Sequence, residues 1–180
     1  MSKYLIVIDM QNDFIDGALG TAEAKALAPA LAEKVRNFKG PVIFTRDAHG
    51  EDYLETQEGR NLPVEHCIYG TKGWELYEEL DRYAKDNHCM IFDKPTFGST
   101  QLAGFVSGVD RMTHIDEIEL IGVCTDICVI TNAMLLKTAL PETTITVNAS
   151  YCAGVTPQSH LTALEAMKAC QIRITGDQEA

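Results

Sequence analysis

The sequence predicts an α/β protein with three layers, in which helices cover both faces of a mainly parallel, six-stranded, Rossmann-like sheet. Two observations lead to this fold class. Short apolar runs alternate with segments of helical periodicity along the chain, as buried parallel strands and their crossover helices require. The chain has 180 residues and no linker-like or low-complexity tract, so we expect a single domain over residues 1–180.

Six short runs rich in branched and aromatic residues are the expected strands. They cover residues 3–9, 41–46, 89–93, 117–122, 143–148 and 172–175. The first run is apolar but short and ends in an acid, Asp9. It is therefore typical of a strand rather than of a signal peptide.

Apolar residues at helical spacing predict a helix between each pair of successive strands. These helices cover residues 29–38, 74–85, 99–106, 126–140 and 156–169. Pro29 suits the first turn of its helix, and Ser99 and Asp126 suit the capping position. The connection over residues 47–73 is long for a compact domain and contains two histidines, which favours a functional role.

The charge of the chain limits its partners. It has 15 basic and 26 acidic residues and a formal net charge of -11. Such a chain repels phosphate backbones and anionic lipids, so we expect neither nucleic acid nor a membrane as a partner. Without a secretion signal, the six cysteines are expected to be reduced thiols of a cytoplasmic protein. A homo-oligomer is left open.

Chemically active side chains follow four of the expected strands. Asp9 and Asp47 follow the first and second strands, and Lys94 follows the third. The fourth strand runs into a turn that contains Cys124 and Cys128. Ligands of open parallel sheets bind beyond the carboxyl ends of the strands, so we expect these side chains to share one rim.

Cys128, Lys94 and Asp9 have the chemistry of a nucleophile and its two helpers. A free thiol is mostly protonated at neutral pH, whereas a helix N-terminus and a neighbouring ammonium both favour the thiolate. Asp9 is suited to accept the thiol proton and to return it to a leaving amine. Each residue taken alone would more often be structural, and only their combination predicts catalysis.

Two motifs resemble the isochorismatase-like cysteine hydrolases. Residues 9–14, DMQNDF, are similar to the opening signature DxQxDF, and residues 122–129, GVCTDICV, are similar to the nucleophile segment. The resemblance implies a six-stranded parallel sheet, the catalytic set Asp9, Lys94 and Cys128, and hydrolysis of a small amide through a thioester. It also implies a cis peptide bond at Val123–Cys124, with the backbone N–H groups of Cys124 and Cys128 stabilising the oxyanion.

Within that family, the long connection looks most like nicotinamidases. The sequences Asp47-Ala48-His49 and HCIYGTKG at residues 66–73 match motifs whose aspartate and histidines bind zinc or iron. The resemblance implies a divalent metal, with zinc favoured over iron or manganese, and no organic cofactor. The ligands would be Asp47, His49 and His66. Glu58 is the expected fourth ligand and Glu55 the alternative.

The substrate is less well defined than the catalytic set. We expect hydrolysis of nicotinamide to nicotinate and ammonia, with Phe14 as a wall of the substrate pocket. The run Pro95-Thr96-Phe97-Gly98-Ser99-Thr100 departs from the glycine-led run usual in nicotinamidases. One alternative is a metal-free hydrolase of a carbamoyl or ureido compound, in which His49 and His66 are hydrogen-bonded loop residues. Another is a noncatalytic or thiol-redox binding protein that uses Cys124 and Cys128.

Overall fold

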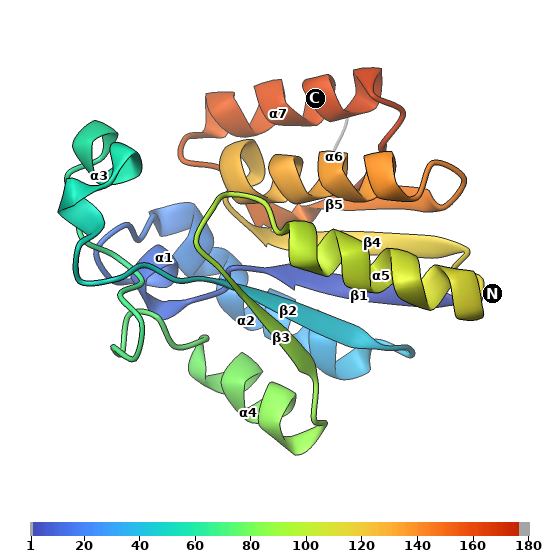
Figure 1. Cartoon of the computed structure of the whole chain (residues 1–180), viewed down its shortest axis with the longest axis horizontal. Helices are drawn as coiled ribbons and strands as arrows, with labels where there is room; N and C mark the ends of the chain where they lie inside the picture. The colour runs from blue at the N-terminus through green and yellow to red at the C-terminus, as the bar shows by residue number, and fades with distance from the viewer. Residues whose placement is uncertain (1, 177–180) are drawn as a thin grey trace.

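The computed structural model describes residues 2–176 and contains one six-stranded sheet (Figure 1). The strands are β1 Lys3–Ile8, β2 Val42–Asp47, β3 Met90–Lys94, β4 Glu117–Val123, β5 Thr144–Ala153 and β6 Arg173–Thr175. Their order is β3-β2-β1-β4-β5-β6, and every neighbouring pair is parallel. The predicted fold class is confirmed, and the sheet is entirely rather than mainly parallel. The expected bounds of the domain, residues 1 and 180, lie outside the described residues.

Helices cover both faces of this sheet. They are α1 Asn12–Ile15, α2 Ala22–Asn37, α3 Gln57–Asn61, α4 Glu78–Asp86, α5 Thr100–Met112, α6 Ile130–Ala139 and α7 Pro157–Ala169. Figure 1 shows α5, α6 and α7 above the sheet and α2 and α4 below it. A 3₁₀ turn, η1 Tyr53–Glu55, and a π-helical turn, η2 Thr125–Val129, complete the described elements.

Alternate residues of the strands supply two hydrophobic cores. Ile6 and Ile8 of β1 belong to the core under α5, α6 and α7, whereas Leu5 and Val7 belong to the core under α1, α2 and α4. These four side chains are fully buried, which explains why the strand reads as a continuous apolar run. Burying one such side chain contributes about 1.5–3 kcal/mol.

Helix α2 begins earlier than the sequence predicted, and the interpretation of Pro29 as a first-turn residue is wrong. The hydroxyl of Thr21 caps the helix by accepting from the Ala24 N–H at 3.1 Å. Pro29 lies inside the helix on its exposed side. The helix persists because the residues of its buried stripe lie on both sides of the proline: Ala24, Ala28, Leu31, Ala32 and Val35.

Three other boundaries differ from the predicted ones, two of them because residues near the expected helix start make other contacts. Asp126 is not a helix cap: Cys124 precedes the π-helical turn, and the Asp126 carboxylate instead accepts from the Val155 N–H at 3.0 Å. Helix α4 begins at Glu78, not at Trp74, because Leu76 makes an antiparallel bridge to Gln11. Strand β5 is longer than expected and reaches Ala153, which pairs with Val123 after a register shift.

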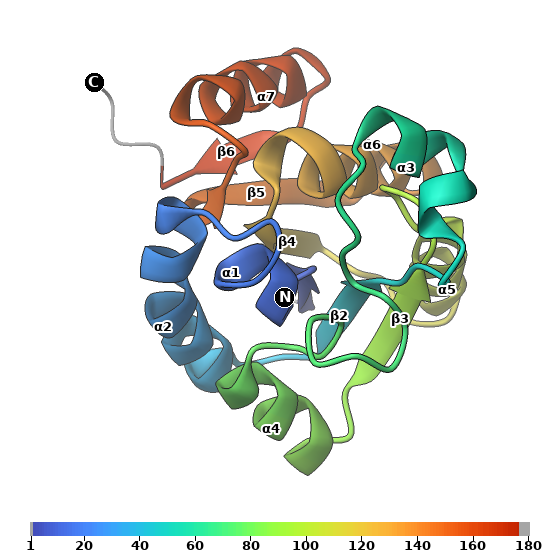
Figure 2. The ribbon, with the colours of Figure 1, turned by 90° about the vertical axis from the view of Figure 1, so that its left-hand side faces the viewer.

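The carboxyl ends of the strands carry the long connections. They lie on the left in Figure 1 and face the viewer in Figure 2, where α1 and α3 stand in front of the sheet. The strand order reverses between β1 and β4, so the segments after these two strands diverge to opposite faces. Within residues 2–176, no helix is both long and apolar enough to cross a bilayer.

Candidate active site

Asp9, Lys94 and Cys128 meet at the point where the strand order reverses. The Lys94 ammonium lies between the other two, with its Nζ 2.6 Å from Asp9 Oδ2 and 3.5 Å from Cys128 Sγ. Their side chains come from the ends of β1 and β3 and from the turn after β4. All three residues are buried, with Cys128 the most exposed at 5 %.

The strand ends fix the direction of the Asp9 carboxylate. Asp9 has a positive φ of 48°. Thr45 of β2 donates its hydroxyl to Asp9 Oδ1 at 2.6 Å. Gly122 of β4 lies beside this turn with a φ of 123°, and a Cβ there would come 2.1 Å from the Ile8 carbonyl oxygen. Only glycine permits this close approach of β4 to the end of β1.

Burial and the neighbouring charges shift the pKa values of all three catalytic side chains. Burial raises the pKa of Cys128 well above its usual value, and the Asp9 charge raises it further against the opposing effect of Lys94. Burial also raises the pKa of Asp9, although Lys94 and the Thr45 hydroxyl oppose this change. Burial opposes the charge of Lys94, but the nearby Asp9 keeps its pKa above the ordinary value. Asp9 is therefore placed to take the thiol proton as the sulfur reacts.

The turn that carries Cys128 is tied to its surroundings by hydrogen bonds. The Val123–Cys124 peptide bond before it is cis. The N–H groups of Ile127 and Val129 donate to the Cys124 carbonyl at 3.1 and 3.0 Å. The Thr125 hydroxyl lies 2.8 Å from His160 Nδ1 of α7. These contacts hold the start of the helix at the end of β4, where backbone N–H groups lack intrahelical partners.

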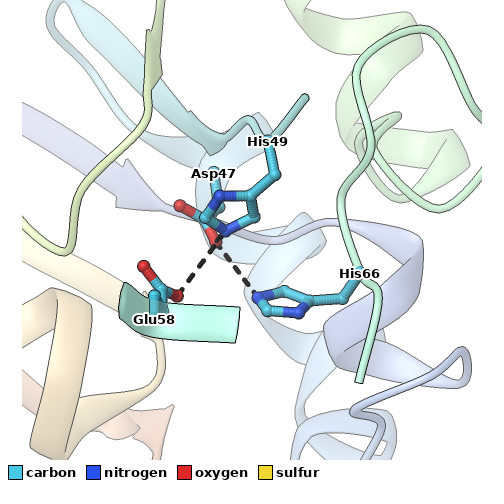
Figure 3. Close-up of side chains that lie close together, drawn as sticks. All are labelled: Asp47, His49, Glu58 and His66. Atoms are coloured by element: carbon cyan, nitrogen blue, oxygen red, sulfur yellow. Dashed lines mark hydrogen bonds and ion pairs between the residues drawn. The ribbon is translucent and has the colours of Figure 1, made fainter. Parts of the chain in front are cut away.

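A second cluster adjoins the first and has the composition of a metal site. Asp47, His49, Glu58 and His66 point toward one another in Figure 3, and their ligand atoms all lie within 4.8 Å of each other. Asp47 Oδ2 is 2.9 Å from His49 Nε2 and 3.5 Å from His66 Nε2. Asp47 Oδ1 is 3.3 Å from Lys94 Nζ, so the two clusters share a wall.

The surroundings of these four side chains fit a divalent cation. His66 Nδ1 donates to the Val64 carbonyl at 2.8 Å, which orients the ring so that Nε2 faces the cluster. Burial raises the pKa of Asp47, but hydrogen bonds to His49 and His66 and the charge of Lys94 outweigh it and hold the pKa below its usual range. Two imidazoles and a dissociated carboxylate suit zinc and iron. Of the two expected glutamates, Glu58 belongs to the cluster and Glu55 does not.

A cavity of about 280 Å³ opens onto both clusters. Cys128, Asp47 and Glu58 contribute to its wall. Phe14 also lines it and lies against His66, with 5.7 Å between ring centroids, as expected of a pocket wall. The remaining lining is mostly apolar: Leu19, Thr21, Leu62, His66, Phe97, Cys124, Ile127 and Val155. The arrangement suits a small substrate with one polar reacting group.

Sequence reasoning missed three polar side chains that support the site. Gln11 accepts from the Asp47 N–H at 2.7 Å and donates to the Asp47 carbonyl at 2.8 Å. Thr45 holds Asp9, as described above, and Asn132 donates to the Cys128 carbonyl at 2.8 Å. Gln11 could have been noticed within the DMQNDF motif, whereas Thr45 and Asn132 carry no local signal.

Comparison with known proteins places the chain in a family. The model of the Isochorismatase domain matches residues 3–179. A nicotinamidase/pyrazinamidase of Mycobacterium tuberculosis is 29 % identical over 190 residues, covering 96 % of this chain and 97 % of the relative. The crystal structure of a nicotinamidase/pyrazinamidase from Bacillus subtilis superposes with a TM-score of 0.81 at 26 % identity, covering 97 % of this chain and 100 % of that one. A pyrazinamidase of Pyrococcus horikoshii, solved in complex with zinc, has a TM-score of 0.77 at 27 % identity, covering 97 % and 99 % of the two chains. The chain belongs to the isochorismatase family.

Proposed function

We propose that this protein hydrolyses nicotinamide to nicotinate and ammonia, with Cys128 as the nucleophile. The observation that carries the proposal is the Lys94 ammonium held between Asp9 and the Cys128 sulfur. Cys128 lies on the wall of a cavity that also reaches a cluster of metal ligands. The names of the relatives support nicotinamide as the substrate.

The geometry supports a two-stage reaction. In the first stage, Asp9 takes the thiol proton while the sulfur attacks the amide carbon, and the same proton then leaves with the amine as ammonia. In the second stage, Asp9 takes a proton from water, whose oxygen attacks the thioester, and the thiol is restored as nicotinate departs. The backbone N–H groups of Cys124 and Cys128 are the proposed oxyanion donors.

Asp47, His49, His66 and Glu58 are the proposed ligands of a divalent metal, with zinc favoured over iron or manganese. When bound, the ion supplies a Lewis acid beside the cavity that orients a heterocyclic nitrogen. Asp47 belongs to this cluster and also lies 3.3 Å from Lys94 Nζ. The same carboxylate would therefore contact both a bound ion and the ammonium. The close grouping of the four ligands makes a metal-free hydrolase of carbamoyl compounds the weaker candidate.

The test is release of ammonia from nicotinamide by the purified protein supplied with zinc, iron or manganese. Cys128→Ala should abolish it, whereas Cys152→Ala, which changes another buried cysteine of the same core, should retain it. Turnover by Cys128→Ala would refute the nucleophile. A wild-type protein that hydrolyses a ureido compound but not nicotinamide would refute the substrate.

The cellular setting of the reaction also stays a prediction. All six cysteines are free, which supports a reducing compartment such as the cytoplasm. The proposed partner is a small amide, and a homo-oligomer is neither required nor opposed by the geometry of the site.

A further inference from the structure

The rim of the cavity carries three apolar side chains that are far from buried. Leu62, Phe97 and Val155 line the cavity and are 39 %, 46 % and 50 % exposed. They come from three separate connections: the one after α3, the one between β3 and α5, and the one between β5 and α7. Because they face both the cavity and the solvent, a ligand in the cavity would cover them, and the aromatic ring of Phe97 is the one suited to another flat ring.

The segment that carries Phe97 is fixed to helix α6. Asn132 of α6 donates to the Phe97 carbonyl at 3.2 Å and accepts from the Ser99 N–H at 2.9 Å. Gly98, between them, lies so close to the helix that a Cβ would come 2.7 Å from Thr131 Cγ2. Phe97 is therefore presented by a segment held at three successive residues, although its ring is half exposed.

Asn132 also contacts the backbone of the nucleophile, Cys128. Asn132 is 1 % exposed, and its amide also donates to the Cys128 carbonyl at 2.8 Å. One buried amide thus sets the position of the Phe97 segment relative to the turn that carries the reacting sulfur. A shift of this amide would change the distance between the wall of the cavity and the reacting atom.

We propose that Phe97 is a specificity-determining residue that selects flat aromatic amides, and that Asn132 is the positioning residue that holds it at the cavity. The proposal rests on the proposed amide hydrolysis and names the class of substrate that the rim selects. Phe97 offers its ring to the face or edge of a planar ring, and a saturated ring of the same size presents no such surface.

The test compares the dissociation constants of benzamide and cyclohexanecarboxamide, which differ in the flatness of the ring. Calorimetry on Cys128→Ala protein measures binding without turnover. We expect benzamide to bind more tightly and Phe97→Ala to reduce this preference about fivefold. The matched rim variant Leu62→Ala should weaken both ligands and leave the preference unchanged. Equal binding of the two amides before mutation, or an unchanged preference in Phe97→Ala, would overturn the role of Phe97.

Asn132→Asp tests the positioning role. Its carboxylate retains an acceptor for the Ser99 N–H but loses the amide that donates to Phe97 and Cys128. We expect the preference to fall as in Phe97→Ala, with no further fall in the double variant. A lowered melting temperature with an unchanged preference would show a merely structural role and overturn the proposal. Asn132→Ser serves if the aspartate variant does not fold.

Hydrolysis of nicotinamide by the wild-type protein, measured in parallel, separates the two proposals. If nicotinamide is not hydrolysed but the preference for benzamide follows Phe97 and Asn132, the proposed reaction fails and the inference stands. If nicotinamide is hydrolysed and the preference does not depend on these residues, the inference alone fails.

Discussion

The hydroxyl of Thr45 allows a sharp test of the role of Asp9. The valine of Thr45→Val has the same shape but removes the 2.6 Å hydrogen bond that Thr45 donates to Asp9 Oδ1. A hydrogen bond to a charged group contributes about 1.5–3 kcal/mol. Because Asp9 keeps its ion pair with Lys94 at 2.6 Å, we expect the lower end, about 1.5 kcal/mol. In a domain of this size that corresponds to a fall of roughly 3–6 °C in melting temperature.

The same change should move the acid limb of the activity profile. The Thr45 hydroxyl lowers the pKa of Asp9, so its removal raises that pKa. Asp9 must be ionised to accept the thiol proton. The pH at which kcat/KM falls on the acid side should therefore move upward, as measured by initial rates of ammonia release across pH.

Thr146→Val is the matched control for this prediction. Thr146 is also buried, on β5, and donates its hydroxyl to Glu117 Oε1 at 2.7 Å, away from the cavity. The control should lower the melting temperature without moving the acid limb. A Thr45→Val enzyme with an unchanged acid limb would refute the assignment of Asp9 as the base.

Three further predictions concern the metal site and the ion pairs of the sheet. Gln11→Leu removes both hydrogen bonds to the Asp47 backbone. It should weaken zinc binding about 10–100-fold, as measured by competition with a chelator. An unchanged zinc affinity would show that Asp47 does not need this support. Glu58→Gln should also weaken zinc binding in that assay, and Glu55→Gln should not; the reverse order would identify the wrong glutamate. Glu119→Gln should cost about 2 kcal/mol of unfolding free energy at pH 7, because it removes the charge-assisted hydrogen bonds that Lys3 and Lys34 donate to a buried carboxylate. Burial raises the pKa of Glu119, but hydrogen bonds from those lysines outweigh burial and lower the pKa. The stability that Glu119 contributes is therefore present above about pH 4.5 and lost as the pH falls further. Urea unfolding should show a smaller difference in unfolding free energy between the wild-type protein and the variant at pH 3 than at pH 7.

The sequence was sufficient for the strands and for the set of residues at their ends. Parallel strands buried on both faces must be apolar along their length, so β1 and β4 were visible as local runs. The carboxyl ends of parallel strands share one edge, which is why the sequence alone predicts that Asp9, Lys94 and Cys128 meet. The start of α2 was misplaced because Pro29, a residue typical of first turns, lies inside that helix instead.

Only the tertiary structure decided how these residues act together. Whether Glu58 or Glu55 joins the cluster depends on how α3 and η1 are folded, because both glutamates belong to the same long connection. The protonation of Cys128 depends on burial and on carboxylates contributed by other strands. Asn132 carries no local signal for its contact with the Phe97 segment, because Phe97 and Ser99 lie more than 30 residues away. Strand and helix patterns are local properties of a chain, whereas pKa values, ligand sets and buried hydrogen bonds arise from groups that only folding brings into contact.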